Sequence, residues 1–256
     1  MIAMSDSPNI YSKYYSRKEK AQKYYLTRSD LIGYLTVEKE TKILLSLIGK
    51  TSINTLVEIG VGGGVISAKL LNKLSPDLLI GIDTSIHMLH IAKKNLYSHK
   101  KNPLKTSVNL IRASIYYLPL KESIVDLFIT IRLLSHLPQK KLVFRELKKA
   151  LRNTGTVMFD YYNRNSVLSL SKLLSGSYGD STDISTLRLE SKAADFEIIK
   201  VKSGFSIGHV IFDRIPKKII PFFFLVDSLL SRSFILRSFS ARRFVLMKKN
   251  GKSVNR

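Results

Sequence analysis

Two acidic residues and a group of glycines are spaced as a ligand-binding site would require. An apolar run over residues 53–59 contains Glu58 and leads into a turn with glycine at positions 60, 62, 63 and 64. A second apolar run, residues 78–82, ends in Asp83. The pattern predicts two strands joined by a helix, each strand with a carboxylate at its carboxyl end. Doubly wound sheets bind their ligands at this end of the strands.

The turn also indicates what kind of ligand it holds. Counted from Gly60, the dinucleotide fingerprint Gly-x-Gly-x-x-Gly/Ala would need a small residue where Val65 stands, and no Gly-x-x-x-x-Gly-Lys phosphate loop is near. Glu58 would repel a pyrophosphate and attract an ammonium group. S-adenosylmethionine (SAM) is a positively charged nucleoside without phosphates, and it fits this turn. Asp83 would then accept hydrogen bonds from the ribose hydroxyls, as an acid about 20 residues after the first glycine does in nucleotide folds.

Four blocks of the sequence carry a resemblance to a known family. They are Val-Glu-Ile-Gly-Val-Gly-Gly-Gly (57–64), Gly-Ile-Asp-Thr-Ser-Ile-His-Met-Leu (81–89), Ala-Ser-Ile-Tyr-Tyr-Leu-Pro-Leu (113–120) with Ile-Val-Asp-Leu-Phe (124–128), and Leu-Arg-Asn-Thr-Gly-Thr-Val-Met-Phe (151–159). In this order they resemble class I SAM-dependent methyltransferases of the type-11 group, which includes the ubiquinone and menaquinone C-methyltransferases. The resemblance extends from about residue 50 to 160.

The resemblance implies which residues bind the cofactor. Where the family usually has an acid on the adenine amino group, this chain has Ser114, whose hydroxyl accepts that hydrogen bond without charge assistance. The affinity for adenine would then be lower, or the backbone at Ile115 would make most of the contact with the adenine. Arg132 is expected to bind an acidic group or to form only a salt bridge. The expected cofactor-binding residues are Glu58, Gly60, Gly62, Gly64, Asp83, Thr84, Met88, Ser114, Ile115 and Arg132.

His136 is the candidate catalytic residue. In the family's topology it lies just after the fourth strand, at the rim of the active site, where it would deprotonate a hydroxyl or phenol. The alternative is a histidine that orders the loop and contacts the cofactor. Residues 160–162 (Asp-Tyr-Tyr) are expected to shape the acceptor side, and Tyr14 or Tyr15 to line the site.

No metal site is expected. His87 and His90 are three residues apart and His99 follows, but no acid or cysteine accompanies them, so a surface helix explains them better. The Asn-Pro-Pro-Tyr/Phe tetrad that nucleobase-amino methyltransferases carry after the fourth strand is also missing. A nucleic-acid acceptor is therefore the less favoured one.

The alternation of apolar and amphipathic segments predicts a parallel α/β sheet. With the family resemblance, we expect a Rossmann-like, doubly wound, seven-stranded and mostly parallel sheet with a helical N-terminal cap, as a single domain over 1–256. Its parts are the cap 1–50, the cofactor-binding core 51–160 and the acceptor-side half 161–256. The expected strands are 53–59, 77–82, 107–112, 124–131, 154–161, 196–201 and 241–248; the expected helices from residue 63 onward are 63–74, 85–99, 138–150, 163–174 and 184–194, with a loop at 176–183.

Composition limits the possible partners and locations. The 256 residues include no cysteine, which excludes disulfides and thiolate chemistry and fits a reducing compartment. The net charge of +23 favours anionic partners such as nucleic acid or acidic membranes, but the lysines are scattered, and a solvated surface explains them equally well. The longest apolar stretch, residues 219–230, is too short to span a bilayer. We expect a cytoplasmic protein, or one peripheral at the membrane.

Residues 201–256 are strongly basic, with 12 Lys and Arg against 2 Asp, a balance of +10. Within them, residues 205–240 combine phenylalanine, isoleucine and leucine with basic residues. This segment either lies in a membrane interface or packs on the sheet with its arginines outward. We favour packing, with part of it forming an apolar mouth for the substrate.

The sequence therefore predicts a SAM-dependent methyltransferase that modifies an O, N or C atom of a small or lipid-like acceptor. Two alternatives stay open. The charge motivates an RNA or protein methyltransferase, although no RNA-binding module is visible, and Ser114 keeps open a non-catalytic SAM-fold protein that binds a partner. The sequence does not predict an oligomeric state.

Overall fold

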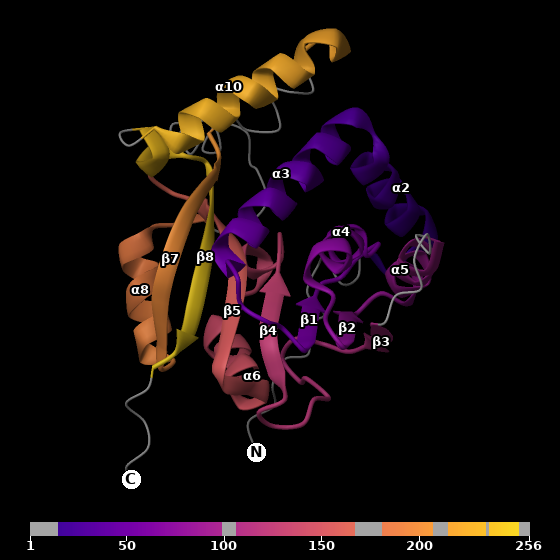
Figure 1. The fold of residues 1–256 in the computed structure, drawn as a ribbon, viewed down its shortest axis with the longest axis vertical. Helices are drawn as coiled ribbons and strands as arrows, with labels where there is room; N and C mark the ends of the chain where they lie inside the picture. Colours follow the sequence, from indigo (N-terminus) through magenta and orange to yellow (C-terminus); the bar gives the residue numbers. More distant parts are fainter. Residues whose placement is uncertain (1–14, 99–105, 167–180, 207–214, 234–235, 251–256) are drawn as a thin grey trace.

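A computed structural model describes residues 15–98, 106–166, 181–206, 215–233 and 236–250. Its centre is a sheet of strand order β3-β2-β1-β4-β5-β8-β7 (Figure 1), with β6 paired to β5. Only β8 runs antiparallel to its neighbours β5 and β7. The strands are β1 (Thr55–Ile59), β2 (Leu78–Asp83), β3 (Ser107–Arg112), β4 (Val125–Thr130), β5 (Leu151–Asn163), β6 (Ser181–Thr182), β7 (Phe196–Phe205) and β8 (Arg242–Lys249).

This topology confirms the predicted doubly wound, mostly parallel sheet. The seven long strands lie where the sequence patterns place them, and β5 and β7 are longer than predicted. The short β6 adds an eighth strand in a segment predicted as loop, because Tyr162 and Asn163 extend β5 far enough to pair with it. The helix predicted over 163–174 falls mostly outside the described residues.

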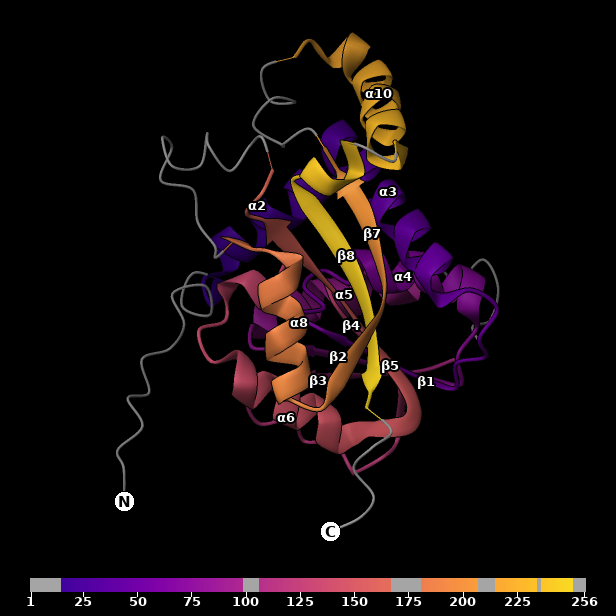
Figure 2. The same cartoon turned by 90° about the vertical axis from the view of Figure 1, so that its left-hand side faces the viewer.

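Helices cover both faces of the sheet (Figures 1 and 2). On one side lie α3, α4 and α5, and on the other lie α6 and α8. The helices are α2 (Lys18–Ser29), α3 (Leu31–Ile48), α4 (Val65–Leu74), α5 (Ile86–Ser98), α6 (Lys140–Ala150), α8 (Ile184–Ala193) and α10 (Ile220–Arg232), with 3₁₀ turns η1 (Leu134–His136), η2 (Lys217–Ile219) and η3 (Leu236–Phe239).

Two hydrophobic cores result from the alternation of side chains along the strands. Leu56 and Leu127, which are register partners, pack into the core with α3 and α4. The next pair along the same strands, Val57 and Phe128, packs into the core with α6 and α8. Both faces of the central strands are therefore buried, which explains their nearly continuous apolar sequence.

The N-terminal helices form a tight hairpin above the sheet. Asp30 caps α3 by accepting a hydrogen bond of 2.7 Å from the Gly33 backbone N–H. A Cβ atom on Gly33 would lie 2.2 Å from the Thr27 carbonyl oxygen, so the close approach of α2 and α3 requires glycine at this position. The hairpin fixes the face of α2 that carries Tyr24 and Arg28.

The segment between β7 and β8 contains α10. Because β7 is parallel to β5, this helix lies at the same edge of the sheet as the carboxyl ends of β1 and β4, above α3 (Figure 1). Ile220 and Phe224 are buried in the core with α3, as predicted for packing on the sheet. Across the described residues, no helix is long and apolar enough to cross a membrane.

Candidate active site

The turn after β1 has the backbone conformation for which its glycines were singled out. Gly60, Gly62 and Gly64 have φ angles of 72°, 52° and 72°, in the left-handed region that side chains disfavour. The N–H groups of Gly60 and Val61 donate to the Ile82 carbonyl oxygen at 2.8 and 3.0 Å, which ties the turn to the end of β2.

The glycines of this turn differ in what they contact. Gly60 and Gly62 line a cavity, and so does Gly63, where an added Cβ would lie 2.6 Å from the ring of Tyr25. Gly64 was predicted to bind the cofactor, but it does not line the cavity. It is the N-cap of α4, and a Cβ on it would lie 3.3 Å from Ala92 of α5. Gly64 thus allows α4 and α5 to pack closely.

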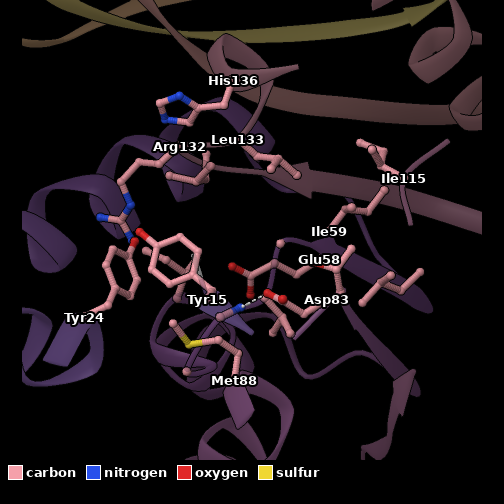
Figure 3. Close-up of a pocket in the computed structure, with 18 of the residues that line it drawn as sticks. Tyr15, Tyr24, Glu58, Ile59, Asp83, Met88, Ile115, Arg132, Leu133 and His136 are labelled. Atoms are coloured by element: carbon pink, nitrogen blue, oxygen red, sulfur yellow. Dashed lines mark hydrogen bonds between the residues drawn. The ribbon is translucent and has the colours of Figure 1, made fainter. Parts of the chain in front are cut away.

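The cavity has a volume of about 630 Å³ and lies at the carboxyl edge of the sheet (Figure 3). Its walls come from the glycine turn, from α2, and from the segments that follow β2, β3 and β4. This size is within the usual range of ligand pockets, about 300–1,000 Å³. The predicted residues that line it are Glu58, Gly60, Gly62, Asp83, Thr84, Met88, Ser114, Ile115, Arg132 and His136.

Glu58 and Asp83 lie close together on the cavity wall (Figure 3). Asp83 accepts hydrogen bonds of 2.9 Å from the backbone N–H groups of Gly62 and Ser85, one on each carboxylate oxygen, and burial raises the pKa of Asp83. Glu58 is 4% exposed and accepts a hydrogen bond from the Ser67 hydroxyl. Burial raises the pKa of Glu58 to about 7, although the Ser67 hydroxyl and the charge of Arg132 oppose the rise.

Neither carboxylate has a cationic partner within the described part of the chain, where the ion pairs involve other residues. Two buried carboxylates on a cavity wall are therefore left without an ion-pair partner, and the more distant charge of Arg132 stabilises ionised Glu58 only in part. Such an arrangement costs stability and favours a cationic ligand.

Another part of the cavity wall is apolar. Met88 and Ile115 are 2% and 5% exposed and present an aliphatic surface there. The Ser114 hydroxyl oxygen accepts a hydrogen bond of 3.3 Å from the Tyr116 backbone N–H. It keeps an acceptor lone pair for a ligand amino group, but it carries no charge.

Four charged side chains, three of them buried and the fourth, Arg132, partly buried, form a network beside the cavity that the sequence patterns did not predict. Glu40 of α3 accepts two hydrogen bonds from Arg132 Nη1, at 2.9 and 3.0 Å, and one from Arg242 of β8. Asp160 of β5 accepts from Arg242 Nε and, at 2.6 Å, from the Arg132 backbone N–H. The network connects α3, β5, β8 and the segment after β4.

The network shifts the pKa values of Glu40 and Arg242 in favour of their charged forms. Burial alone would raise the pKa of Glu40, but Arg132 and Arg242 hold it below its usual value. Burial would lower the pKa of Arg242, but Asp160 and Glu40 raise it well above its usual value. A sequence signal for Glu40 exists, since it falls on the same buried face of α3 as Val37 and Leu44.

Arg132 was expected to bind an acidic group or to form a salt bridge, and the structure shows the salt bridge to Glu40. Its φ angle of 61° is in the left-handed region, a strained backbone for a bulky residue. Its guanidinium also lies beside Tyr24 on the cavity wall (Figure 3). Burial alone would raise the pKa of Tyr24, but Arg132 and Arg28 lower it.

The acceptor-side predictions are placed as follows. His136 lines the cavity from η1, and Tyr15 and Tyr162 also line it. Asp160 instead belongs to the ion network, and Tyr161, 2% exposed, packs into the core with α6 and α8. Tyr14 and His99 fall outside the described residues. Within the described residues, no three His, Cys, Asp or Glu side chains are grouped as metal ligands.

Comparison with known proteins agrees with this geometry. Residues 57–159 match the family model described as a methyltransferase domain. The fold is that of a methyltransferase. The structure resembles magnesium protoporphyrin IX methyltransferase from Synechocystis PCC 6803, solved with bound SAH, at a TM-score of 0.66 and 12% identity over 94% of this chain and 98% of that one. It also resembles a SAM-dependent methyltransferase from Thermotoga maritima, at 0.62 and 18% identity over 94% and 98%.

The methyltransferase fold is not restricted to methyl transfer. The [4+2]-cyclase SpnF matches at a TM-score of 0.59 and 14% identity, over 82% of this chain and 80% of that one. No curated protein matches the sequence.

Proposed function

We propose that this protein transfers a methyl group from SAM to a small or lipid-like acceptor. The observation that carries the proposal is the pair of buried carboxylates, Glu58 and Asp83, which line a 630 Å³ cavity and form no ion pair within the described residues. The methyltransferase-domain match over residues 57–159 and the SAH-bound structural neighbour support it.

The residues present fit SAM. Asp83 would accept hydrogen bonds from the ribose hydroxyls, Met88 and Ile115 would contact the adenine, and Glu58 would face the positively charged part of the molecule. The positive-φ glycines leave the backbone bare where the ligand passes. When bound, SAM supplies an electrophilic methyl group on a sulfonium, and the protein's contribution is to place the acceptor behind that methyl.

The acceptor would enter on the side of the cavity formed by Tyr15, Tyr24, Leu133, His136 and Tyr162. These side chains are mainly apolar or aromatic, which favours a small or lipid-like acceptor. His136 would take the proton of a hydroxyl or phenol acceptor. The His136→Gln variant should then lose turnover and keep its affinity for SAM, whereas a loop-ordering histidine would lower both.

Radiolabelled SAM tests the proposal directly. The purified protein is incubated with methyl-labelled SAM and with separate lipid, small-metabolite, RNA and protein fractions of a cell extract. Label in the lipid or small-molecule fraction, absent with the Asp83→Ala variant, supports the proposal. Label in RNA or protein would support the charge-motivated alternative. SAM binding without label in any fraction would favour a non-methylating role such as that of the cyclase neighbour.

A further inference from the structure

Helix α10 presents apolar side chains on two opposite faces. Its inner face carries Ile220 and Phe224, which are buried against the rest of the molecule. Phe222, Leu225 and Leu229 are 62%, 58% and 57% exposed, and their spacing of three and four residues places them on one outer face. Packing on the sheet accounts for the inner face and leaves the outer face unexplained.

The helix is fixed so that this outer face cannot rotate inward. Asp227, on the inner side, is fully buried and forms an ion pair with Lys39 of α3. It also accepts a hydrogen bond of 2.7 Å from the Ser206 backbone N–H at the end of β7. The Ser231 hydroxyl donates to the Gly204 carbonyl oxygen at 3.1 Å. The exposure of the three apolar residues is therefore built into the fold.

Basic residues flank α10 in the sequence. Exposed Lys217 and Lys218 lie in η2 just before the helix, and exposed Arg237 follows it in η3. Asp227, the one acidic residue of the helix, is buried and paired. Of the thirteen large hydrophobic side chains that are exposed in the described part of the chain, five are concentrated in this region: Ile219, Phe222, Leu225, Leu229 and Phe239.

The position of α10 in the fold places its outer face relative to the cavity. The helix follows β7 and precedes β8, so it lies at the carboxyl ends of the parallel strands (Figures 1 and 2). The cavity is lined by the residues that end β1 and β2, and it lies at the same side of the sheet. A flat partner on α10 would therefore lie at the edge of the molecule that carries the cavity.

We propose that α10 is an interfacial helix that binds the protein to an anionic lipid surface. Phe222, Leu225 and Leu229 enter the boundary between headgroups and acyl chains, and Lys217 and Lys218 contact the lipid phosphates. RNA fits the surface less well, because two of the three apolar residues have no ring on which a base can stack. This inference does not rest on the proposed function, because it requires neither SAM nor methyl transfer.

Vesicle co-sedimentation tests the proposal. The full-length protein is mixed with vesicles of phosphatidylcholine alone or of phosphatidylcholine and phosphatidylglycerol in equal parts. We expect sedimentation with the anionic vesicles and its loss at high salt. The triple variant F222S/L225S/L229S should lower the partition coefficient by about tenfold or more, because its three apolar anchors are gone. K217E/K218E should lower it by about tenfold on anionic vesicles.

Matched variants control for surface changes in general. L26S/L189S/I199S removes three exposed apolar side chains elsewhere, and K93E/K94E reverses two exposed lysines of α5. Both should sediment as the wild type does, and all variants should keep its unfolding temperature and SAM affinity. Wild-type protein that stays in the supernatant, or a triple variant that binds anionic vesicles like the wild type, would overturn the proposal. So would a wild-type dimer in light scattering that the triple variant converts to a monomer without any vesicle binding, or RNA binding that needs Lys217 and Lys218 but not the apolar residues.

Discussion

Two pairs of buried carboxylates lie at the carboxyl edge of this sheet, and the protein treats them differently. Glu40 and Asp160 are held by Arg132 and Arg242, which lower the pKa of Glu40. Glu58 and Asp83 have no such partners among the described residues, and burial raises the pKa of both. The first pair is neutralised by arginines of the same chain and links α3 to β5 and β8. The second pair lowers the stability of the ligand-free protein, and a bound cationic ligand would restore that stability.

The largest expected effect concerns the compensated pair. Arg242→Met should lower the free energy of unfolding by about 3–5 kcal/mol, because it leaves Asp160 buried without an ion-pair partner and Glu40 with Arg132 alone. Urea denaturation measures this loss. Arg145→Met, which removes a 66%-exposed partner of Glu146, is the control and should cost about 1 kcal/mol at most. Equal losses in the two variants would contradict the structural role of the network.

The next effect concerns the uncompensated pair. Asp83→Ala should lower SAM affinity by about 100-fold, or about 2–3 kcal/mol, because the hydrogen bonds of a charged acceptor are lost. Asp77→Ala removes an exposed carboxylate just before β2, at the opposite end of the strand, and should leave affinity unchanged. Calorimetric titration distinguishes the two variants. An Asp83→Ala protein that binds SAM like the wild type would show that the ribose is held elsewhere.

The ionised carboxylate of Glu58 should lower the stability of the ligand-free protein. Below a pH of about 4.5, its carboxyl is protonated in both the folded and unfolded states, and Glu58→Gln should match the wild type in stability. Between there and the folded-state pKa of about 7, only the unfolded state loses the proton, so wild-type stability falls as pH rises. Above pH 7 the variant should be more stable by about 3 kcal/mol. Denaturation curves at several pH values test this, and a wild type more stable than the variant at high pH would refute it.

The smallest expected effect concerns the part of the cavity that would bind the adenine of SAM. Ser114→Asp should raise SAM affinity by about 3–5-fold, because a charged acceptor replaces a hydroxyl near the adenine amino group. Ser107→Asp places the same charge at the exposed start of β3 and serves as the control. An unchanged affinity in the Ser114 variant would indicate that the backbone at Ile115 makes the adenine contact.

The two halves of the site also differ in how far the sequence predicts them. The glycines, Glu58 and Asp83 belong to local patterns, in which strand, turn and ligand contact follow one another within about 30 residues. The ion network depends on Glu40 and Arg242, which are 202 positions apart and meet only through tertiary packing. For the same reason the sequence placed Asp160 and Tyr161 at the acceptor side, where the structure places Tyr162 alone of the three.

Helix α10 shows a related limit. The sequence offered packing and a membrane interface as alternatives for residues 205–240, because composition does not reveal on which side of a helix the fold lies. The structure shows Phe224 turned inward and Phe222 outward, so one helix carries a packed face and an exposed one. The same segment accommodates both interpretations, and its lipid binding stays a proposal.

Proton release during SAM binding tests the central difference between the two carboxylate pairs most directly. Calorimetric titrations at about pH 6.5, in two buffers of different ionisation enthalpy, count the protons exchanged. Since Glu58 is partly protonated there and would face a cation in the complex, wild-type protein should release protons and Glu58→Gln should release fewer. Equal proton exchange by the two proteins, or no SAM binding by the wild type, would contradict the account.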